Sequence, residues 1–262
     1  MKSFGVKLWS KDFVKNLSFA KECIANLDKG LFDYVELFAL PNSFQDTKDL
    51  VKEHLNGKKV VIHAPHSVFG LDTGNPERLE QNLQDLKSSQ EFADMLDAKI
   101  IILHTGYNEG EKFVDESVRQ FKIIDDSRIA VENLPSYCTA TGKLLHGTSP
   151  QEIKKVIEGS GCQFCFDFAH AICAANAYGR DIWEDLAGYA ALKPSMYHLS
   201  DGNFNSDKDE HLHYGEGNYD LKRLVKEFTS ENAIITMETG YGVPTGAEPW
   251  VKDINYIRNL IR

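Results

Sequence analysis

The sequence predicts an α/β fold, a (β/α)8 TIM barrel that forms a single domain over residues 1–262. Short apolar segments rich in β-branched residues alternate with amphipathic segments, as expected of parallel strands buried on both faces and joined by helices. Eight such units in 262 residues match the usual length of this barrel. A doubly wound open sheet is the alternative, but no glycine-rich dinucleotide turn follows the first strand.

The predicted strands are short and apolar, and they occur in the order Phe4–Trp9, Tyr34–Phe38, Lys59–His63, Ile100–His104, Ile129–Glu132, Gln163–Asp167, Met196–Leu199 and Ile234–Glu238. Helical periodicity predicts amphipathic helices at 13–27, 76–96, 110–124 and 149–159, and an eighth helix at 249–262 closes the chain. The helix at 149–159 has Ser149 as its N-cap, Pro150 at its first position and Gly159 near its end.

Composition predicts a cytoplasmic protein without a membrane segment, which we expect to be a monomer. The N-terminus has no apolar signal region, and no apolar run approaches the roughly 18 residues that a membrane span needs. Five scattered cysteines indicate a reducing compartment, and we interpret the C-x-x-C of Cys162 and Cys165 as core packing. The net charge of −10 disfavours a nucleic-acid partner only slightly, because bound divalent ions would offset part of it.

Residues of the kinds that bind metals stand at or just after the predicted strand ends. Buried imidazoles and carboxylates are costly unless they are paired or coordinated, and the carboxyl ends of barrel strands share one rim. The set therefore predicts a centre with more than one metal ion. Its nine members are His63, His104, Glu132, Asp167, His170, His198, Asp209, His211 and Glu238.

The loop that follows the seventh strand contains one ambiguity. Asp209 and His211 are two residues apart, so in extended backbone they face the same side and can hold one ion. His213 continues the alternation and is a rival to His211. Gly215 and Gly217 indicate a sharply shaped turn after this segment.

The ordered motifs LHTG, VEN, FDFAH, HLSD and D-x-H followed by GEGN resemble the endonuclease IV (type 2 apurinic/apyrimidinic endonuclease) family, within the xylose isomerase-like barrel superfamily. The resemblance runs from about His63 to Glu238. It implies three zinc sites, held by His63, His104 and Glu132, by Glu132, Asp167, His198 and Glu238, and by His170, Asp209 and His211.

This resemblance implies a DNA repair hydrolase that cleaves the phosphodiester 5′ to abasic sites in DNA. About three zinc ions, with manganese in part of the site, would activate a water molecule and stabilise charge on phosphorus, so no organic cofactor is expected. Glu132 and Glu238 are the expected catalytic residues. Lys7, His66 and His213 are expected to contact the substrate.

The first third of the chain departs from that family, whose first strand usually reads G-x-H-x-S. Here Lys7 stands where the histidine would lie, and the loops LPNSFQD and APHSVFG contain no arginine or lysine. Phe44 or Phe69 would be the wedge that helps to expose a flipped nucleotide.

A sugar isomerase or epimerase of the same superfamily is the alternative. It would use one divalent ion on four of the nine residues, with Glu132 and Glu238 exchanging a proton with the sugar carbon, and five metal-type residues would be surplus. A non-catalytic metal-dependent binding module is a third reading. The sequence leaves open the substrate, the metal identity, the oligomeric state and the choice between His211 and His213.

Overall fold

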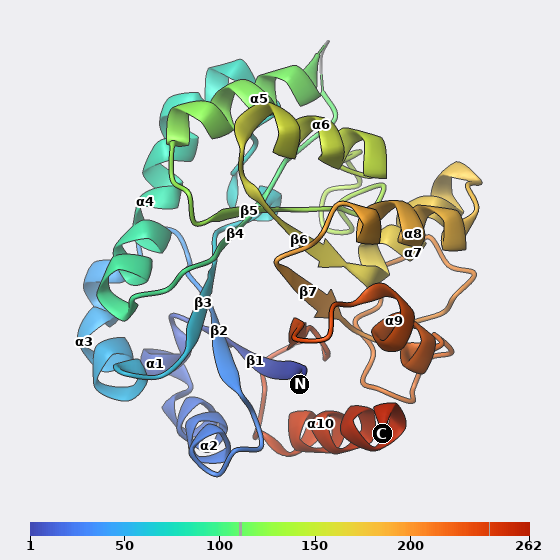
Figure 1. Ribbon diagram of the computed structural model, residues 1–262. Coiled ribbons are helices and arrows are strands. Elements are labelled where there is room, and N and C mark those ends of the chain that lie inside the picture. Colours follow the sequence, from blue (N-terminus) through green and yellow to red (C-terminus); the bar gives the residue numbers. More distant parts are fainter. Residues whose placement is uncertain (110–111, 241) are drawn as a thin grey trace.

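The computed structural model describes residues 1–109, 112–240 and 242–262. Eight parallel strands follow one another around a closed barrel, and β8 pairs with β1 to complete it (Figure 1). The strands are β1 Ser3–Trp9, β2 Tyr34–Phe38, β3 Val60–His63, β4 Ile101–His104, β5 Ile129–Glu132, β6 Gln163–Asp167, β7 Met196–Leu199 and β8 Ile234–Met237. The predicted (β/α)8 TIM barrel is confirmed, and each strand boundary lies within one residue of its prediction.

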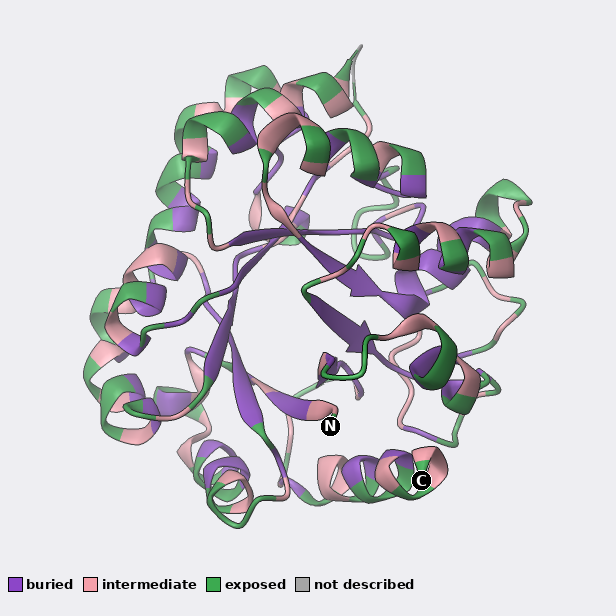
Figure 2. Ribbon diagram, in the orientation of Figure 1, coloured by how far each residue is buried: buried purple, intermediate pink, exposed green. Residues whose placement is uncertain are grey.

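Helices surround the barrel, with their buried faces towards the strands and their exposed faces outward (Figures 1 and 2). They are α1 Asp12–Lys15, α2 Leu17–Asp28, α3 Phe44–Leu55, α4 Leu79–Leu96, α5 Phe113–Ile124, α6 Pro150–Ser160, α7 Phe168–Tyr178, α8 Ile182–Ala191, α9 Leu221–Phe228 and α10 Glu248–Ile261. Two short 3-10 segments, η1 Ser67–Phe69 and η2 Pro76–Arg78, precede α4. In the part of the chain that the structure describes, no helix is long and apolar enough to cross a membrane.

The helix expected at 13–27 is wrong in one respect, because it is broken at Asn16 into α1 and α2. Asn16 has φ −140° and ψ 47°, and its side-chain amide donates to the carbonyl oxygen of Pro244 at 2.9 Å. Asparagine is a weak helix former, so this bond to a distant segment can hold the residue outside helical geometry. The first two residues of the helix expected at 110–124 lie outside the described residues, and α5 covers the rest from Phe113.

The helix α6 begins as predicted. The Ser149 hydroxyl accepts a hydrogen bond from the backbone N–H of Glu152 at 3.3 Å, and Pro150 occupies the first turn. The left-handed residue that ends the helix is Gly161, with φ 78°. Gly159 has another reason to be glycine, because a Cβ there would lie 2.7 Å from Val118.

The barrel interior has an apolar end and a polar end. The apolar cluster consists of Tyr34, Val61, Ile100, Ile102, Ala130, Cys165 and Met196. Most of these residues come from the first half of their strands, whereas the metal-type side chains come from the last positions or from the segments that follow. The polar cluster therefore occupies the carboxyl end of the barrel, where active sites of such barrels lie. Cys165 belongs to the core, as predicted for the C-x-x-C.

Candidate metal centre

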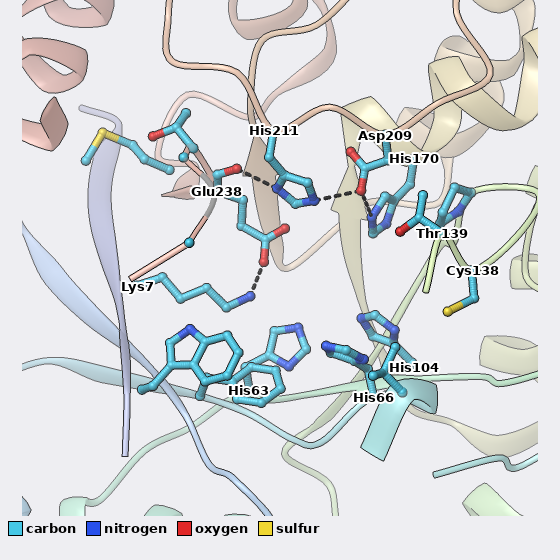
Figure 3. A pocket seen from close by; sticks show the side chains of 18 of the residues that line it. Lys7, His63, His66, His104, Cys138, Thr139, His170, Asp209, His211 and Glu238 are labelled. Atoms are coloured by element: carbon cyan, nitrogen blue, oxygen red, sulfur yellow. Dashed lines mark hydrogen bonds and ion pairs between the residues drawn. The ribbon is translucent and has the colours of Figure 1, made fainter. Parts of the chain in front are cut away.

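A cavity of about 620 Å³ opens at the carboxyl end of the barrel. Figure 3 shows imidazoles and carboxylates from opposite sides of the barrel facing one another across it. Among the described residues, five overlapping groups have ligand atoms within 4.8 Å of one another, and two of them are His63, His198 and Glu238, and Glu132, Cys165 and His198. The other three groups together contain all nine sequence-predicted residues. These three groups are His63, His104 and Glu132, then Glu132, Asp167, His198 and Glu238, and finally His170, Asp209 and His211. They coincide with the three sets that the sequence resemblance implies.

Glu132 stands between the first two groups. Its Oε2 lies 3.0 Å from His104 Nε2 and 3.3 Å from His63 Nε2. Its Oε1 lies 3.0 Å from His198 Nδ1. Burial raises the pKa of Glu132, but His198 and His104 outweigh it and hold the pKa well below its usual range. The side chain is therefore a charged carboxylate whose two oxygens face different groups, which is the geometry of a bridging ligand.

Backbone carbonyls fix the orientation of several imidazoles. The pairs are His63 Nδ1 with Ala64 O at 2.7 Å, His170 Nδ1 with Asn133 O at 2.9 Å, and His211 Nδ1 with Glu238 O at 2.7 Å. A carbonyl oxygen only accepts, so Nδ1 of these rings keeps its proton, and in the neutral ring that binds a metal the lone pair is on Nε2. That nitrogen faces the carboxylates, as metal-binding histidines require.

The VEN and FDFAH motifs tie two strand ends together. The side-chain amide of Asn133 donates to the carbonyl oxygen of Asp167 at 2.8 Å and accepts from its backbone N–H at 2.8 Å. Asp167 also caps helix α7, because its Oδ1 accepts the backbone N–H of His170 at 2.7 Å. The motif spacing thus places Asp167 at the end of β6 and His170 in the first helical turn, and both point into the centre.

The aspartate of HLSD holds the loop that carries the third group. Asp201 accepts backbone N–H groups from Gly202, Gly215, Gly217 and Tyr219 at 2.8 to 3.1 Å. A Cβ on Gly217 would lie 2.4 Å from Asp201 Oδ1, so only glycine fits there. The predicted sharp turn is therefore present, and Gly215 adopts φ +91°.

The geometry distinguishes His211 from His213 in the loop that follows β7. His211 lies in the third group, with its Nε2 2.6 Å from Asp209 Oδ2. His213 lies in none of the groups and does not line the cavity. Its Nδ1 is 2.7 Å from Asp253 on α10, and its ring packs edge-on against Trp250.

Sequence reasoning missed Glu36, which is fully buried in β2. Its Oε2 accepts from His198 Nε2 at 2.9 Å, and its Oε1 lies 3.2 Å from Lys7 Nζ. Burial raises the pKa of Glu36, but His198 and Lys7 bring it down to about 2. A signal existed, because a carboxylate in the apolar strand YVELF needs a buried partner.

Lys7 and His66, both expected to contact substrate, line the cavity. The Lys7 ammonium bonds to Glu238, as Figure 3 shows, and its pKa is raised because Glu238 and Glu36 outweigh the effect of burial. Burial, together with His104, His63 and Lys7, holds the pKa of His66 well below its usual range. His66 is therefore a neutral imidazole at the cavity wall.

Aromatic and aliphatic side chains form the rest of the wall. Trp9 and Phe38 line the cavity and stack with ring centroids 4.9 Å apart, whereas Phe69 packs on Phe38 at 5.7 Å and is not itself among the lining residues. Phe44, one of the two expected wedges, instead packs edge-on against Phe92 at 4.9 Å in the contact between α3 and α4, away from the cavity. Among the described residues that line the cavity, Lys7 is the sole lysine or arginine.

The donor set fits divalent ions. Imidazoles and carboxylates suit zinc and manganese, and these side chains are buried and already oriented. Burial lowers the pKa of His170 and of His198, but neighbouring anionic groups raise both well above the usual value. Burial, Glu238 and Glu132 raise the pKa of Asp167 to about 7. These raised pKa values mean that, without a cation, the side chains hold extra protons that offset the negative charge of the carboxylates. The clusters therefore indicate divalent metal binding.

Comparison with known proteins places these features in a family context. A protein of Pediococcus pentosaceus named probable endonuclease 4 is 28% identical over 222 residues, which cover 78% of this chain and 71% of that protein. A crystal structure of a D-tagatose 3-epimerase-like protein superposes with a TM-score of 0.72 at 19% identity, covering 99% of this chain and 97% of the other. Endonuclease IV from Thermus thermophilus superposes with a TM-score of 0.64 at 20% identity, covering 99% and 98%.

The two structural likenesses show the fold alone, because both identities are low. The match to the family described as xylose isomerase-like TIM barrel is broader and covers residues 26–260. Together with the buried clusters of imidazoles and carboxylates, it indicates a metal-dependent enzyme. The chain belongs to the xylose isomerase-like TIM barrel family.

Proposed function

We propose that this protein is a zinc-dependent phosphodiesterase of the endonuclease IV type, which cleaves DNA on the 5′ side of abasic sites. The arrangement of nine metal-type residues in three groups, two of which share Glu132, carries the proposal, because one-metal chemistry needs only four of them. The relatives named probable endonuclease 4 support it.

Each residue has a distinct role in this proposal. Divalent ions, when bound, supply an activated water molecule and neutralise charge that develops on the phosphoryl oxygens. Glu132 holds the first two groups at a fixed separation, and Glu238 completes the second. Neutral His66 offers a hydrogen bond to the sugar-phosphate without adding charge. The aromatic wall of Trp9 and Phe38 excludes water from one side of the reacting phosphodiester.

The test uses a DNA duplex with one tetrahydrofuran abasic-site analogue, incubated with the purified protein loaded with zinc. We expect a nick immediately 5′ to the analogue, loss of nicking after chelation and recovery after zinc is returned. An otherwise identical intact duplex is the substrate control. A metal-loaded protein that leaves the abasic duplex intact would falsify the proposal.

A divalent-metal-dependent sugar isomerase or epimerase is the second candidate, and the cavity favours it. A volume of about 620 Å³ with mostly apolar walls is typical of small-molecule sites, and Lys7 is the sole lysine or arginine among the described lining residues. Glu132 and Glu238 both lie beside His198 Nδ1, at 3.0 and 3.3 Å, in the one group that this reaction needs. Turnover of ketohexoses by the manganese-loaded protein would support this candidate, and metal binding without turnover of either substrate would leave a binding module.

A further inference from the structure

A buried polar network lies beneath the candidate metal centre. Lys7 on β1 is the register partner of Glu36 on β2, and His198 on β7 is the register partner of Thr236 on β8. The Glu36 side chain crosses the barrel interior to contact both His198 and Thr236. Residues from four strands therefore meet at one carboxylate, which lies in none of the three ligand groups.

His198 differs from the other imidazoles in the nitrogen that it presents. Its Nδ1 faces the ligand carboxylates, 3.0 Å from Glu132 and 3.3 Å from Glu238. Its Nε2 lies 2.9 Å from Glu36 Oε2. In His63, by contrast, Nδ1 is bonded to a carbonyl and Nε2 faces the centre. His198 therefore needs the opposite tautomer, with the proton on Nε2.

We propose that Glu36 is a positioning residue for the candidate metal centre, which accepts the Nε2–H of His198 and so keeps the Nδ1 lone pair directed at the second ligand group. A carboxylate in this place selects the tautomer, because an ionised carboxylate accepts hydrogen bonds and cannot donate them. Carboxylate partners of this kind orient metal-binding histidines and increase their basicity. The proposal rests on the metal centre of the proposed function and is independent of the reaction that the centre catalyses.

The network fixes Glu36 from three sides. Thr236 Oγ1 donates to its Oε2 at 2.6 Å, and because that uses the one hydroxyl proton of Thr236, Tyr34 must donate to Thr236 at 2.8 Å. Lys7 lies 3.2 Å from Oε1 and supplies the positive charge that a buried carboxylate requires. Glu36 is thus held in place as an ionised acceptor for the Nε2–H of His198.

Cadmium-113 NMR of the metal-substituted protein tests the tautomer directly. A metal on Nδ1 is three bonds from Hε1 but four from Hδ2, whereas a metal on Nε2 is three bonds from both protons. We expect His198 to couple to cadmium through Hε1 alone, and His63, His170 and His211 to couple through Hε1 and Hδ2. Coupling of His198 through both protons would overturn the proposal while leaving the metal centre intact. Absence of any bound cadmium would overturn the metal centre and the proposal together.

Metal affinity of two matched variants provides a second measurement. Glu36→Gln keeps the size of the side chain but removes its charge and introduces a donor. We expect it to weaken binding of one zinc ion by about 10- to 100-fold, the usual effect of losing such a partner. Asp253→Asn makes the same change of charge at a buried carboxylate outside this network and outside the ligand groups, so its zinc affinity should stay close to wild type. Equal affinities for Glu36→Gln and wild type would contradict the proposal. If Glu36→Gln does not fold, the cadmium spectrum of the wild-type protein decides.

Discussion

Replacement of Glu132 by glutamine tests the bridging geometry of the centre. The two carboxylate oxygens face different partners, Oε2 towards His63 and His104 and Oε1 towards His198. A glutamine of the same shape has one oxygen and one NH2 group, so one side meets a donor that cannot bind a cation. Both sides lose the negative charge. The variant should therefore weaken two ions at once.

The expected size of this effect follows from the ligand count. Structural zinc sites with four ligands bind with about 10–16 kcal/mol, so one ligand accounts for about 3–4 kcal/mol. This corresponds to about two to three powers of ten in affinity for each ion that Glu132 holds. After dialysis against a buffered nanomolar concentration of free zinc, elemental analysis should find about three ions in the wild-type protein. The variant should retain close to one, in the group of His170, Asp209 and His211.

A matched control separates ligation from the general loss of a buried charge. Asp253 is a buried carboxylate that binds His213 and the backbone of Tyr214, outside the three groups. Asp253→Asn should keep the wild-type metal content, and thermal unfolding of both variants should establish that they are folded. Loss of a single ion in Glu132→Gln, or of none, would refute the bridging role.

Three further predictions concern the loop, the protons and the substrate. His211→Ala should remove one ion and abolish activity, whereas His213→Ala should keep the metal content, because His213 contacts Asp253 and Trp250 and does not line the cavity. Elemental analysis that gives the reverse would contradict the geometry. Burial lowers the pKa of His211, but Asp209 raises it to about 9. At pH 7 this imidazole must therefore lose a proton before it can bind a metal ion, and the apparent metal affinity should fall as pH decreases. Calorimetry in two buffers of different ionisation enthalpy measures that proton release, and equal heats would exclude it. Because Lys7 is the sole lysine or arginine among the described lining residues, affinity for abasic duplex should decrease only shallowly with added salt, and a steep dependence would point to basic contacts outside the cavity.

The strands and the nine metal-type residues were predictable because one rule governs both. Parallel barrel strands are apolar throughout and end at a shared rim, so a polar residue such as His104 at the end of an apolar run points to the site. The division of these residues into three ligand groups depends on where the side chains point across the barrel. Residue patterns do not contain that information, and only the family resemblance predicted the division.

The remaining features depend on contacts between distant segments. Glu36 carries no motif, and its partner His198 lies 162 residues away. The break at Asn16 depends on a carbonyl oxygen of Pro244, near the other end of the chain. The sequence around Phe44 resembles a loop, but Phe44 is the first residue of α3 and its ring packs on Phe92. Local periodicity contains none of this information, because each contact forms only after the barrel closes.

Each of the eight strands, or the residue directly after it, contributes an ionisable side chain to the centre. The number of bound metal ions therefore sets the net charge of the centre, which in turn selects the charge of the substrate that it can bind. The ionisable side chains from β1 and β2 are Lys7 and Glu36, and the next along the barrel is His63 on β3. With neutral imidazoles, the five carboxylates of Glu36, Glu132, Asp167, Asp209 and Glu238 and the single ammonium of Lys7 give a formal charge of −4. Three divalent ions would make the centre positive by two, which suits an anionic phosphodiester, whereas one ion in the second group, with His170 and His211 protonated, would leave the centre without net charge. We therefore expect proteins loaded with about three ions to bind a phosphodiester, and proteins loaded with one ion to bind only neutral sugars. Tight phosphodiester binding at one ion per chain would contradict this electrostatic argument.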